Sequence, residues 1–241
     1  MHELTLSDVS SIVASGNYGV CYEPIIDLNT MEVFAYEALS RFRCKYNNIT
    51  PDVFFKTIHE NIDLFFLVES LLKQFQLKHR IQGKKLFLNL DPDTCVHERH
   101  VEFWVHLFEN NQDVIIEITE NSDEENVEDI EEFIEWLDMY NLPYAYDDFG
   151  KPNSIYFASL LRKCQFIKLD IYFLRTIRTE VSYMETLRGI VLCAKLNKQY
   201  TVLEGVETLD DLEIARSVGV DYIQGYLFKD KFTTVWNQEN R

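Results

Sequence analysis

Eight apolar runs of strand length recur along the chain of 241 residues, and they constrain the fold more than any other feature. Between the later runs, apolar residues recur at intervals of three and four, the spacing of amphipathic helices. Strands that alternate with helices predict parallel βαβ units, and eight strands predict a (β/α)8, TIM-like barrel. A doubly wound open sheet is the alternative. The runs cover residues 19–28, 32–39, 84–90, 113–119, 144–148, 164–170, 200–206 and 221–228.

Capping signals predict where two of the helices begin. Ser122-x-x-Glu125 and Thr208-x-x-Asp211 are capping boxes, in which each side chain bonds the backbone of the other residue. Gly219 is expected to end the second helix, because glycine readily takes the left-handed conformation that follows many helices.

Charge, apolar run length and cysteine content limit the kind of protein. With 40 acidic and 23 basic residues, the net charge is −17, so we expect no binding to nucleic acid or to an anionic membrane. No apolar run reaches the roughly 20 residues of a membrane span. Five dispersed cysteines indicate a reduced, cytoplasmic protein. No Gly/Ser-rich or Pro-rich linker interrupts residues 1–241, which predicts a single domain.

Polar side chains fall at or near the ends of most predicted strands. In a (β/α)8 barrel these carboxyl ends open onto one face, where the chemistry of such barrels takes place. A surface carboxylate is the ordinary interpretation of any one residue, but a set of carboxylates at one mouth needs cations to offset its repulsion. The set consists of Glu37, Asn89, Glu117, Asp147, Asp148, Lys168, Asp170, Glu204 and Gln224.

The ligand types favour hard cations. Oxygen ligands without histidine or cysteine suit Mg²⁺, Mn²⁺ or Ca²⁺ better than zinc. Adjacent Asp147 and Asp148 suit a pair of ions, since one carboxylate can bridge both. Two ions about 3.5–4 Å apart are a recurring device for hydrolysing phosphate esters. His97, His100 and His106 are instead predicted to lie on a surface helix without binding metal.

Seven short motifs occur in the order found in one protein family. They are Glu37-Ala38-Leu39, FLNLDP (87–92), IIEITE (115–120), YDDFG (146–150), IKLD (167–170), LEGVET (203–208) and IQGYLF (223–228). The series resembles the EAL-domain phosphodiesterases, which hydrolyse cyclic di-GMP, and it spans roughly residues 10–230. The resemblance implies a barrel in which one strand runs antiparallel to the others.

The resemblance also implies roles for individual residues. Lys168 matches the lysine that orients the attacking water, and Glu204 the proposed general base. Arg41 matches a phosphate-contacting arginine, and Asp170 and Gln224 match positions near the substrate. Glu120 and Glu207 match carboxylates that support the metal ligands. The matched metal ligands are Glu37, Asn89, Glu117, Asp147, Asp148 and Glu204.

Three functions are compatible with these residues. The resemblance implies an enzyme that uses two Mg²⁺ or Mn²⁺ ions, is inhibited by Ca²⁺, and converts cyclic di-GMP to linear pGpG. A homodimer is compatible with the resemblance. A catalytically inactive receptor for cyclic di-GMP, or a protein-binding regulator, is the alternative. A metal-dependent enzyme acting on another phosphate ester is the third.

The sequence departs from the family pattern in three places. Lys151 and Pro152 follow YDDFG where Thr-Gly is usual, and proline fixes φ and removes a hydrogen-bond donor. Glu23 replaces a usual glutamine, and Asp91 a usual serine. The two acids add negative charge near a site for a dianionic dinucleotide.

Overall fold

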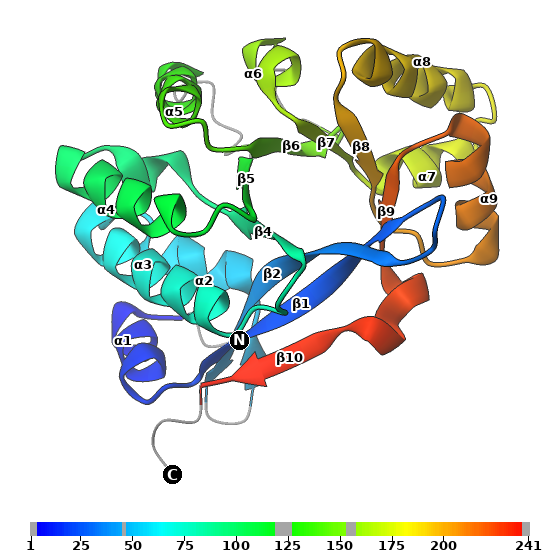
Figure 1. The fold of residues 1–241 in the computed structure, drawn as a ribbon. Coiled ribbons are helices and arrows are strands. Elements are labelled where there is room, and N and C mark those ends of the chain that lie inside the picture. The colour runs from blue at the N-terminus through cyan, green and yellow to red at the C-terminus, as the bar shows by residue number, and fades with distance from the viewer. Residues whose placement is uncertain (1–3, 45–46, 119–126, 153–157, 238–241) are drawn as a thin grey trace.

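The computed structural model describes residues 4–44, 47–118, 127–152 and 158–237. Helices surround a central set of strands (Figure 1). The strands are β1 (Tyr18–Asp27), β2 (Val33–Cys44), β3 (Asn47–Ile49), β4 (Lys85–Asn89), β5 (Val114–Ile118), β6 (Tyr144–Phe149), β7 (Phe166–Leu169), β8 (Tyr200–Leu203), β9 (Tyr222–Gln224) and β10 (Thr233–Trp236).

The helices fill most of the connections between these strands. Short 3-10 segments, η1 (Pro92–Cys95) and η3 (Tyr226–Lys231), follow β4 and β9. The α-helices are α1 (Leu6–Ala14), α2 (Pro51–Ile58), α3 (Ile62–Lys78), α4 (Glu98–Glu109), α5 (Val127–Met139), α6 (Ala158–Lys163), α7 (Tyr172–Ile177), α8 (Tyr183–Leu196) and α9 (Leu209–Val218).

Eight strands close into a barrel in the order β1-β9-β8-β7-β6-β5-β4-β2, with β2 pairing back onto β1. Neighbouring strands are parallel except at β1, which runs antiparallel to both β2 and β9. The predicted barrel with one antiparallel strand is therefore confirmed. Two strands that the sequence did not suggest lie outside the closed ring: β10 pairs with β1, and β3 pairs with β2.

The apolar core has two parts. The larger part packs the outer face of the strands against the helices. The smaller part is a layer inside the barrel to which each of the eight ring strands contributes one residue. Its members are Ile25, Ala35, Phe87, Ile115, Ala145, Phe166, Val202 and Tyr222.

The capping predictions hold where the structure describes the residues. Thr208 and Asp211 form a capping box at the start of α9, and Gly219 ends it at a φ of 76°. The other predicted box, at Ser122 and Glu125, lies outside the described residues. The described part of α5 begins at Val127.

Two predicted strands end earlier than the apolar runs suggested. The run at 221–228 is a strand only to Gln224. The run at 200–206 is a strand only to Leu203, and Gly205 then turns the chain at a φ of 68°. A Cβ on Gly205 would lie 2.2 Å from a side-chain atom of Ile171, so a larger residue does not fit there. The turn leaves Glu204 directly at the end of the strand, at the barrel mouth.

Two further expectations concern the chain as a whole. Within the described ranges, no helix combines the length and the apolar character needed to cross a membrane. The five cysteines are unpaired, as their scattered positions predicted.

Candidate active site at the barrel mouth

A layer of polar side chains lies directly above the apolar layer inside the barrel. Side chains two positions apart on a strand point to the same face. Each polar residue is two positions from an apolar-layer residue of the same strand, toward the mouth. This polar layer consists of Glu23, Glu37, Asn89, Glu117, Asp147, Lys168, Glu204 and Gln224.

A bulge in β6 brings the second aspartate to the same face. Tyr146 pairs with Ile167, but the next pairing joins Phe149 to Leu169, so β6 has one extra residue. Asp148 lies in that bulge with a φ of 53°, a conformation unusual for a residue other than glycine. Adjacent strand residues normally point to opposite faces. The bulge therefore explains how Asp147 and Asp148 can both offer carboxylates to the mouth.

Lys168 lies at the centre of the polar layer and is 1% exposed. Its Nζ atom lies 2.6 Å from Glu117, 2.9 Å from Asp147 and Glu204, and 3.1 Å from Glu37. These carboxylates come from β2, β5, β6 and the end of β8. Residues that are far apart in the sequence thus meet around one ammonium group.

One lysine does not balance the charge of four carboxylates. Burial, and then repulsion from Glu37, raises the pKa of Glu117 well above its usual value. Burial likewise raises the pKa of Asp147 to about 6 and raises that of Glu204. For Glu37, attraction to Lys168 and hydrogen bonds outweigh burial and lower the pKa. Excess negative charge of this kind favours the binding of further cations.

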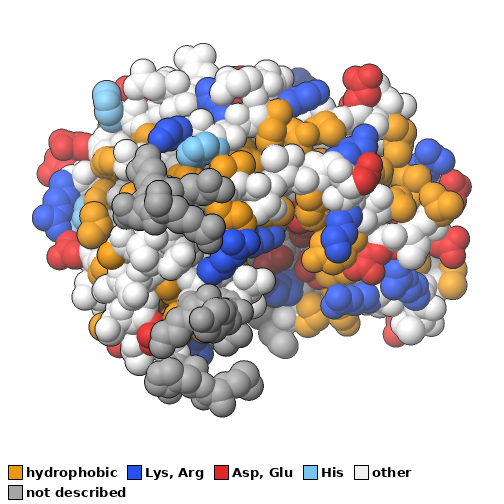
Figure 2. All heavy atoms as spheres, turned by 90° about the horizontal axis from the view of Figure 1, so that it is seen from below, with side chains coloured by type: hydrophobic (Ala, Val, Ile, Leu, Met, Phe, Trp, Pro, Cys, Tyr) orange, Lys and Arg blue, Asp and Glu red, His pale blue; other side chains and the backbone are white. Residues whose placement is uncertain are grey.

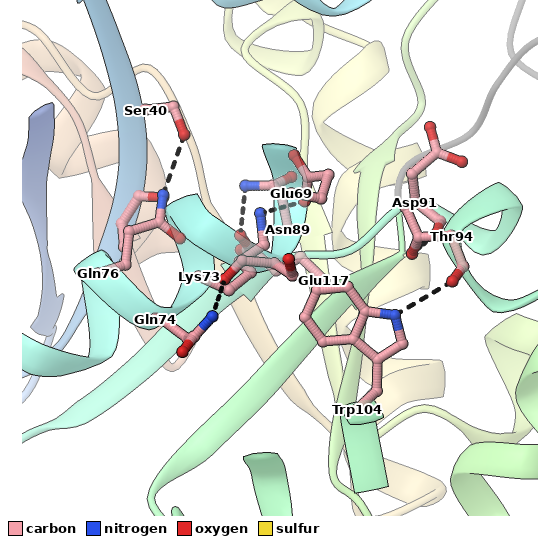
Figure 3. A network of polar contacts seen from close by, with 12 residues as sticks. Ser40, Glu69, Lys73, Gln74, Gln76, Asn89, Asp91, Thr94, Trp104 and Glu117 are labelled. Carbon is pink, nitrogen blue, oxygen red and sulfur yellow. Dashed lines mark hydrogen bonds and ion pairs between the residues drawn. The ribbon is translucent and has the colours of Figure 1, made fainter. Parts of the chain in front are cut away.

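Amide side chains fix the positions of the carboxylates. Asn89 Nδ2 donates to Glu37 and to Glu117, at 3.1 Å in both cases, and Figure 3 shows Asn89 beside Glu117. Gln224 Nε2 donates to Glu37 at 2.6 Å. Glu37 therefore accepts hydrogen bonds from both sides as well as from Lys168.

The segment after Asn89 is held by its own hydrogen bonds. Thr94 Oγ1 donates to the Asp91 carbonyl at 2.7 Å, and Trp104 Nε1 donates to the Thr94 carbonyl at 3.2 Å (Figure 3). Asp91 itself accepts from the backbone of Asp93 and lies 3.5 Å from His59. Asp91, which replaces the serine usual in the family, is thus paired with His59 at the end of α2.

Three of the predicted ligands form a group suited to a divalent cation. Asp147, Asp148 and Glu204 each offer an oxygen, and these oxygens lie within 4.8 Å of one another. Their chemistry fits Mg²⁺ or Mn²⁺. Figure 2 shows Lys and Arg side chains interspersed with acidic ones over one face of the molecule.

Asp148 also has a cationic neighbour, and it comes from the loop in which the sequence departs from the family pattern. Lys151 Nζ lies 2.6 Å from Asp148 Oδ2. The hydrogen bond to Asp148 raises the pKa of Lys151, so the amine is charged at neutral pH. The unusual loop after YDDFG therefore places a positive charge on a predicted metal ligand.

The remaining predicted residues differ in their relation to the polar layer. Arg41 is half-buried on β2 and donates to the Ser40 carbonyl. Asp170 accepts from the backbone of Tyr172 at 2.7 Å at the start of α7. Glu207 is exposed beyond β8, and within the described residues its side chain makes no hydrogen bond or ion pair with the layer. Glu120 lies outside the described residues.

The sequence placed Glu23 near the site as a departure from the family pattern, but not in the polar layer itself. In the structure Glu23 joins that layer opposite Glu37, and burial followed by repulsion from Glu37 raises its pKa to about 7. Its place two positions before the apolar Ile25, on the antiparallel strand, was the available signal. The sequence did not suggest a second group with metal-ligand spacing, formed by His59, Asp91 and Asp93, because His59 is far from the two aspartates in the sequence and no motif joins them.

The three histidines lie on α4 or at its start, and one of them departs from the predicted surface position. His100 is buried, not on the surface, and its ring stacks on Phe66 at a centroid distance of 3.7 Å. In the parts of the chain that the structure describes, His97, His100 and His106 do not form a metal-ligand group.

The fold and the site define a closed α/β barrel whose oxygen-rich mouth surrounds one buried lysine. The family model for the EAL domain matches residues 7–230. The chain belongs to the EAL domain family, as the order of its motifs predicted.

Curated relatives match at low identity. The chain is 24% identical over 230 residues to the cyclic di-GMP phosphodiesterase TpdA of Vibrio parahaemolyticus, covering 94% of this chain and 39% of TpdA. It is 25% identical over 230 residues to the probable cyclic di-GMP phosphodiesterase PdeN of Escherichia coli, covering 91% of this chain and 44% of PdeN. The chain therefore spans less than half the length of these relatives.

Solved structures share the fold. An EAL domain protein from Listeria monocytogenes EGD-e matches with a TM-score of 0.73 and 21% identity, covering 95% of this chain and 94% of that one. BlrP1 of Klebsiella pneumoniae, in a complex with manganese and cyclic di-GMP, matches with a TM-score of 0.74 and 22% identity. That match covers 92% of this chain and 56% of BlrP1.

Proposed function

We propose that this chain is a phosphodiesterase that hydrolyses cyclic di-GMP to linear pGpG with two Mg²⁺ or Mn²⁺ ions. One observation carries the proposal: carboxylates from four different strand ends meet around Lys168 at 2.6–3.1 Å. Relatives named as cyclic di-GMP phosphodiesterases support this choice of substrate.

The cations would be held by the predicted oxygen ligands. Asp147, Asp148 and Glu204 form the group with ligand spacing, and Glu37, Asn89 and Glu117 complete the set. Bound there, two divalent cations would polarise the phosphate and make the attacking water more acidic.

The chain's own residues would orient the water and move its proton. Lys168 contacts carboxylates from four strand ends, and its ammonium group would hold the water by donating a hydrogen bond. Glu204 would accept the proton: its side chain is 18% exposed, and burial raises its pKa, as suits a general base. The water oxygen would bond to phosphorus, the 3′ oxygen would leave and take up a proton, and linear pGpG would result.

The substrate would be bound at the rim of the same mouth. Arg41 would pair with a phosphate, because guanidinium groups bind phosphate oxygens in a fixed geometry. Asp170 and Gln224 would lie near the dinucleotide. We also propose a homodimer, as the resemblance implies.

An inactive receptor for cyclic di-GMP is the second candidate. The Lys151–Asp148 contact favours it, since a ligand already paired with an amine is less available to a metal ion. A receptor would bind the dinucleotide at Arg41 without turning it over.

Product analysis separates these functions. The purified chain is incubated with cyclic di-GMP and Mg²⁺ or Mn²⁺, and the products are resolved by chromatography. We expect pGpG to form, to be lost with chelator or Asp147→Asn, and to decrease with Ca²⁺. The exposed variant Glu185→Gln, on α8, is the control and should match wild type. Binding without turnover would indicate the receptor, and turnover of only other phosphate esters would indicate the third function.

A further inference from the structure

We propose that Lys151 is a tethered cation that competes with a divalent metal ion for Asp148 and so sets the metal concentration at which the site fills. The inference rests on the proposed function, because it concerns the same metal ligands. It assigns to the unusual loop of this chain a role in metal affinity.

The backbone fixes Lys151 over Asp148. The Lys151 amide donates to the Asp148 carbonyl at 3.0 Å, which closes a tight turn. Gly150 lies in that turn with a φ of 92°, and a Cβ there would come within 2.3 Å of the Phe173 ring. The turn is therefore packed against α7, and it returns the Lys151 ammonium to 2.6 Å from Asp148 Oδ2.

The contact uses a carboxylate that a metal ion needs. Asp148 is one of the three residues whose oxygens lie within 4.8 Å of one another. A divalent ion bound there must either displace the ammonium or sit beside it. Both cost binding free energy, because like charges at short distance repel.

The solvent exposure of Lys151 and Asp148 limits how strongly the ammonium group competes with a metal ion. The Lys151 side chain is 55% exposed and that of Asp148 31% exposed. Exposed ion pairs contribute little stability and are screened by salt. Lys151 therefore weakens metal binding without abolishing it, by about two- to fivefold, which corresponds to the usual strength of such a pair.

Metal titration of the whole chain tests the inference without any substrate. Mn²⁺ is added to metal-free protein, and free Mn²⁺ is measured by electron paramagnetic resonance. For the weaker of the bound ions, Lys151→Met should lower the dissociation constant about two- to fivefold. Lys151→Arg keeps the charge and should behave like wild type. Raising the salt to about 0.5 M should narrow the difference between wild type and Lys151→Met.

A matched control removes a lysine from a comparable pair elsewhere. Lys163 lies 3.1 Å from Asp138, and both side chains are also partly exposed. Lys163→Met should leave Mn²⁺ binding unchanged. A similar gain in affinity in Lys163→Met would show a general charge effect and would overturn the inference.

The result also distinguishes this inference from the proposed function. If wild type and Lys151→Met have the same Mn²⁺ affinities, the inference fails, whether or not pGpG forms. If Lys151→Met binds Mn²⁺ more tightly but neither protein forms pGpG, the inference stands and the proposed function fails.

Discussion

The apolar and polar layers inside the barrel come from the same eight strands, two residues apart, yet they differ in what they can contribute. The apolar layer gains stability from burial and close packing. The polar layer buries several carboxylates around Lys168, which raises the pKa of Glu117, Asp147 and Glu204. Groups arranged at the expense of their own solvation are typical of functional sites. The comparison predicts that stability depends on one layer and chemistry on the other.

Removing a charge from the polar layer should give the largest effect on activity. Glu117→Gln keeps the shape of the side chain but removes a metal ligand, and we expect turnover to fall at least about a thousandfold. Because burial raises the pKa of Glu117, the metal-free variant should be as stable as wild type, or more stable, above neutral pH. Steady-state kinetics and thermal unfolding provide the two measurements. A large loss of stability in Glu117→Gln would contradict the proposal that the polar layer contributes to chemistry and not to stability.

Truncating the apolar layer should have the opposite effect. Phe166 is 6% exposed and packs edge-on against Phe87 at a centroid distance of 5.2 Å. Phe166→Ala should lower the free energy of unfolding by about 3–5 kcal/mol, measured by denaturant titration. The protein that remains folded should still bind Mn²⁺. Loss of metal binding in a folded sample would show that the layers are not separable.

The sequence predicted most residues of the polar layer, but not all of the contacts that they make. Motifs in family order located Glu37, Asn89 and Lys168, because strand ends of a parallel barrel meet at one face. The position of Lys151 predicted a positive charge near the carboxylates. Its particular partner, Asp148, could not be predicted, because the contact depends on a bulge and a positive φ that the sequence does not specify.

The fold was predictable to a similar extent. Helical spacing and eight apolar runs predicted the barrel, and the capping box at Thr208 located α9. The apolar run extended beyond the end of β8, however, because Val206 is buried in the outer part of the core after the chain has turned at Gly205. Apolar residues indicate which positions are buried, but not which of them pair in a strand.

The pH dependence of stability should sharpen the comparison at Glu23. Burial, and then Glu37, raises its pKa to about 7, so the folded chain binds a proton more tightly than the unfolded chain. Wild type should therefore lose stability as pH rises from about 4.5 to about 7, by up to about 3 kcal/mol from this group. Glu23→Gln should remove that loss, so its advantage in metal-free protein should grow over this range and then level off. An advantage that shrinks with rising pH would contradict the assignment.

The smallest effect is expected at the rim. Arg41→Ala removes a phosphate contact that is present in both the ground state and the transition state, so KM should rise about tenfold while kcat changes little. Initial-rate kinetics with cyclic di-GMP measure both constants. A fall in kcat without a change in KM would assign Arg41 to the reacting group instead.

Anomalous diffraction from crystals grown with Mn²⁺ tests most directly whether the polar layer is a metal site. We expect two manganese peaks at the mouth, with Asp147, Asp148 and Glu204 among their ligands. The His59, Asp91 and Asp93 group provides an internal comparison, since it has similar spacing but lies outside the polar layer. Peaks at that group alone, or no peak beside Asp147, would contradict the account.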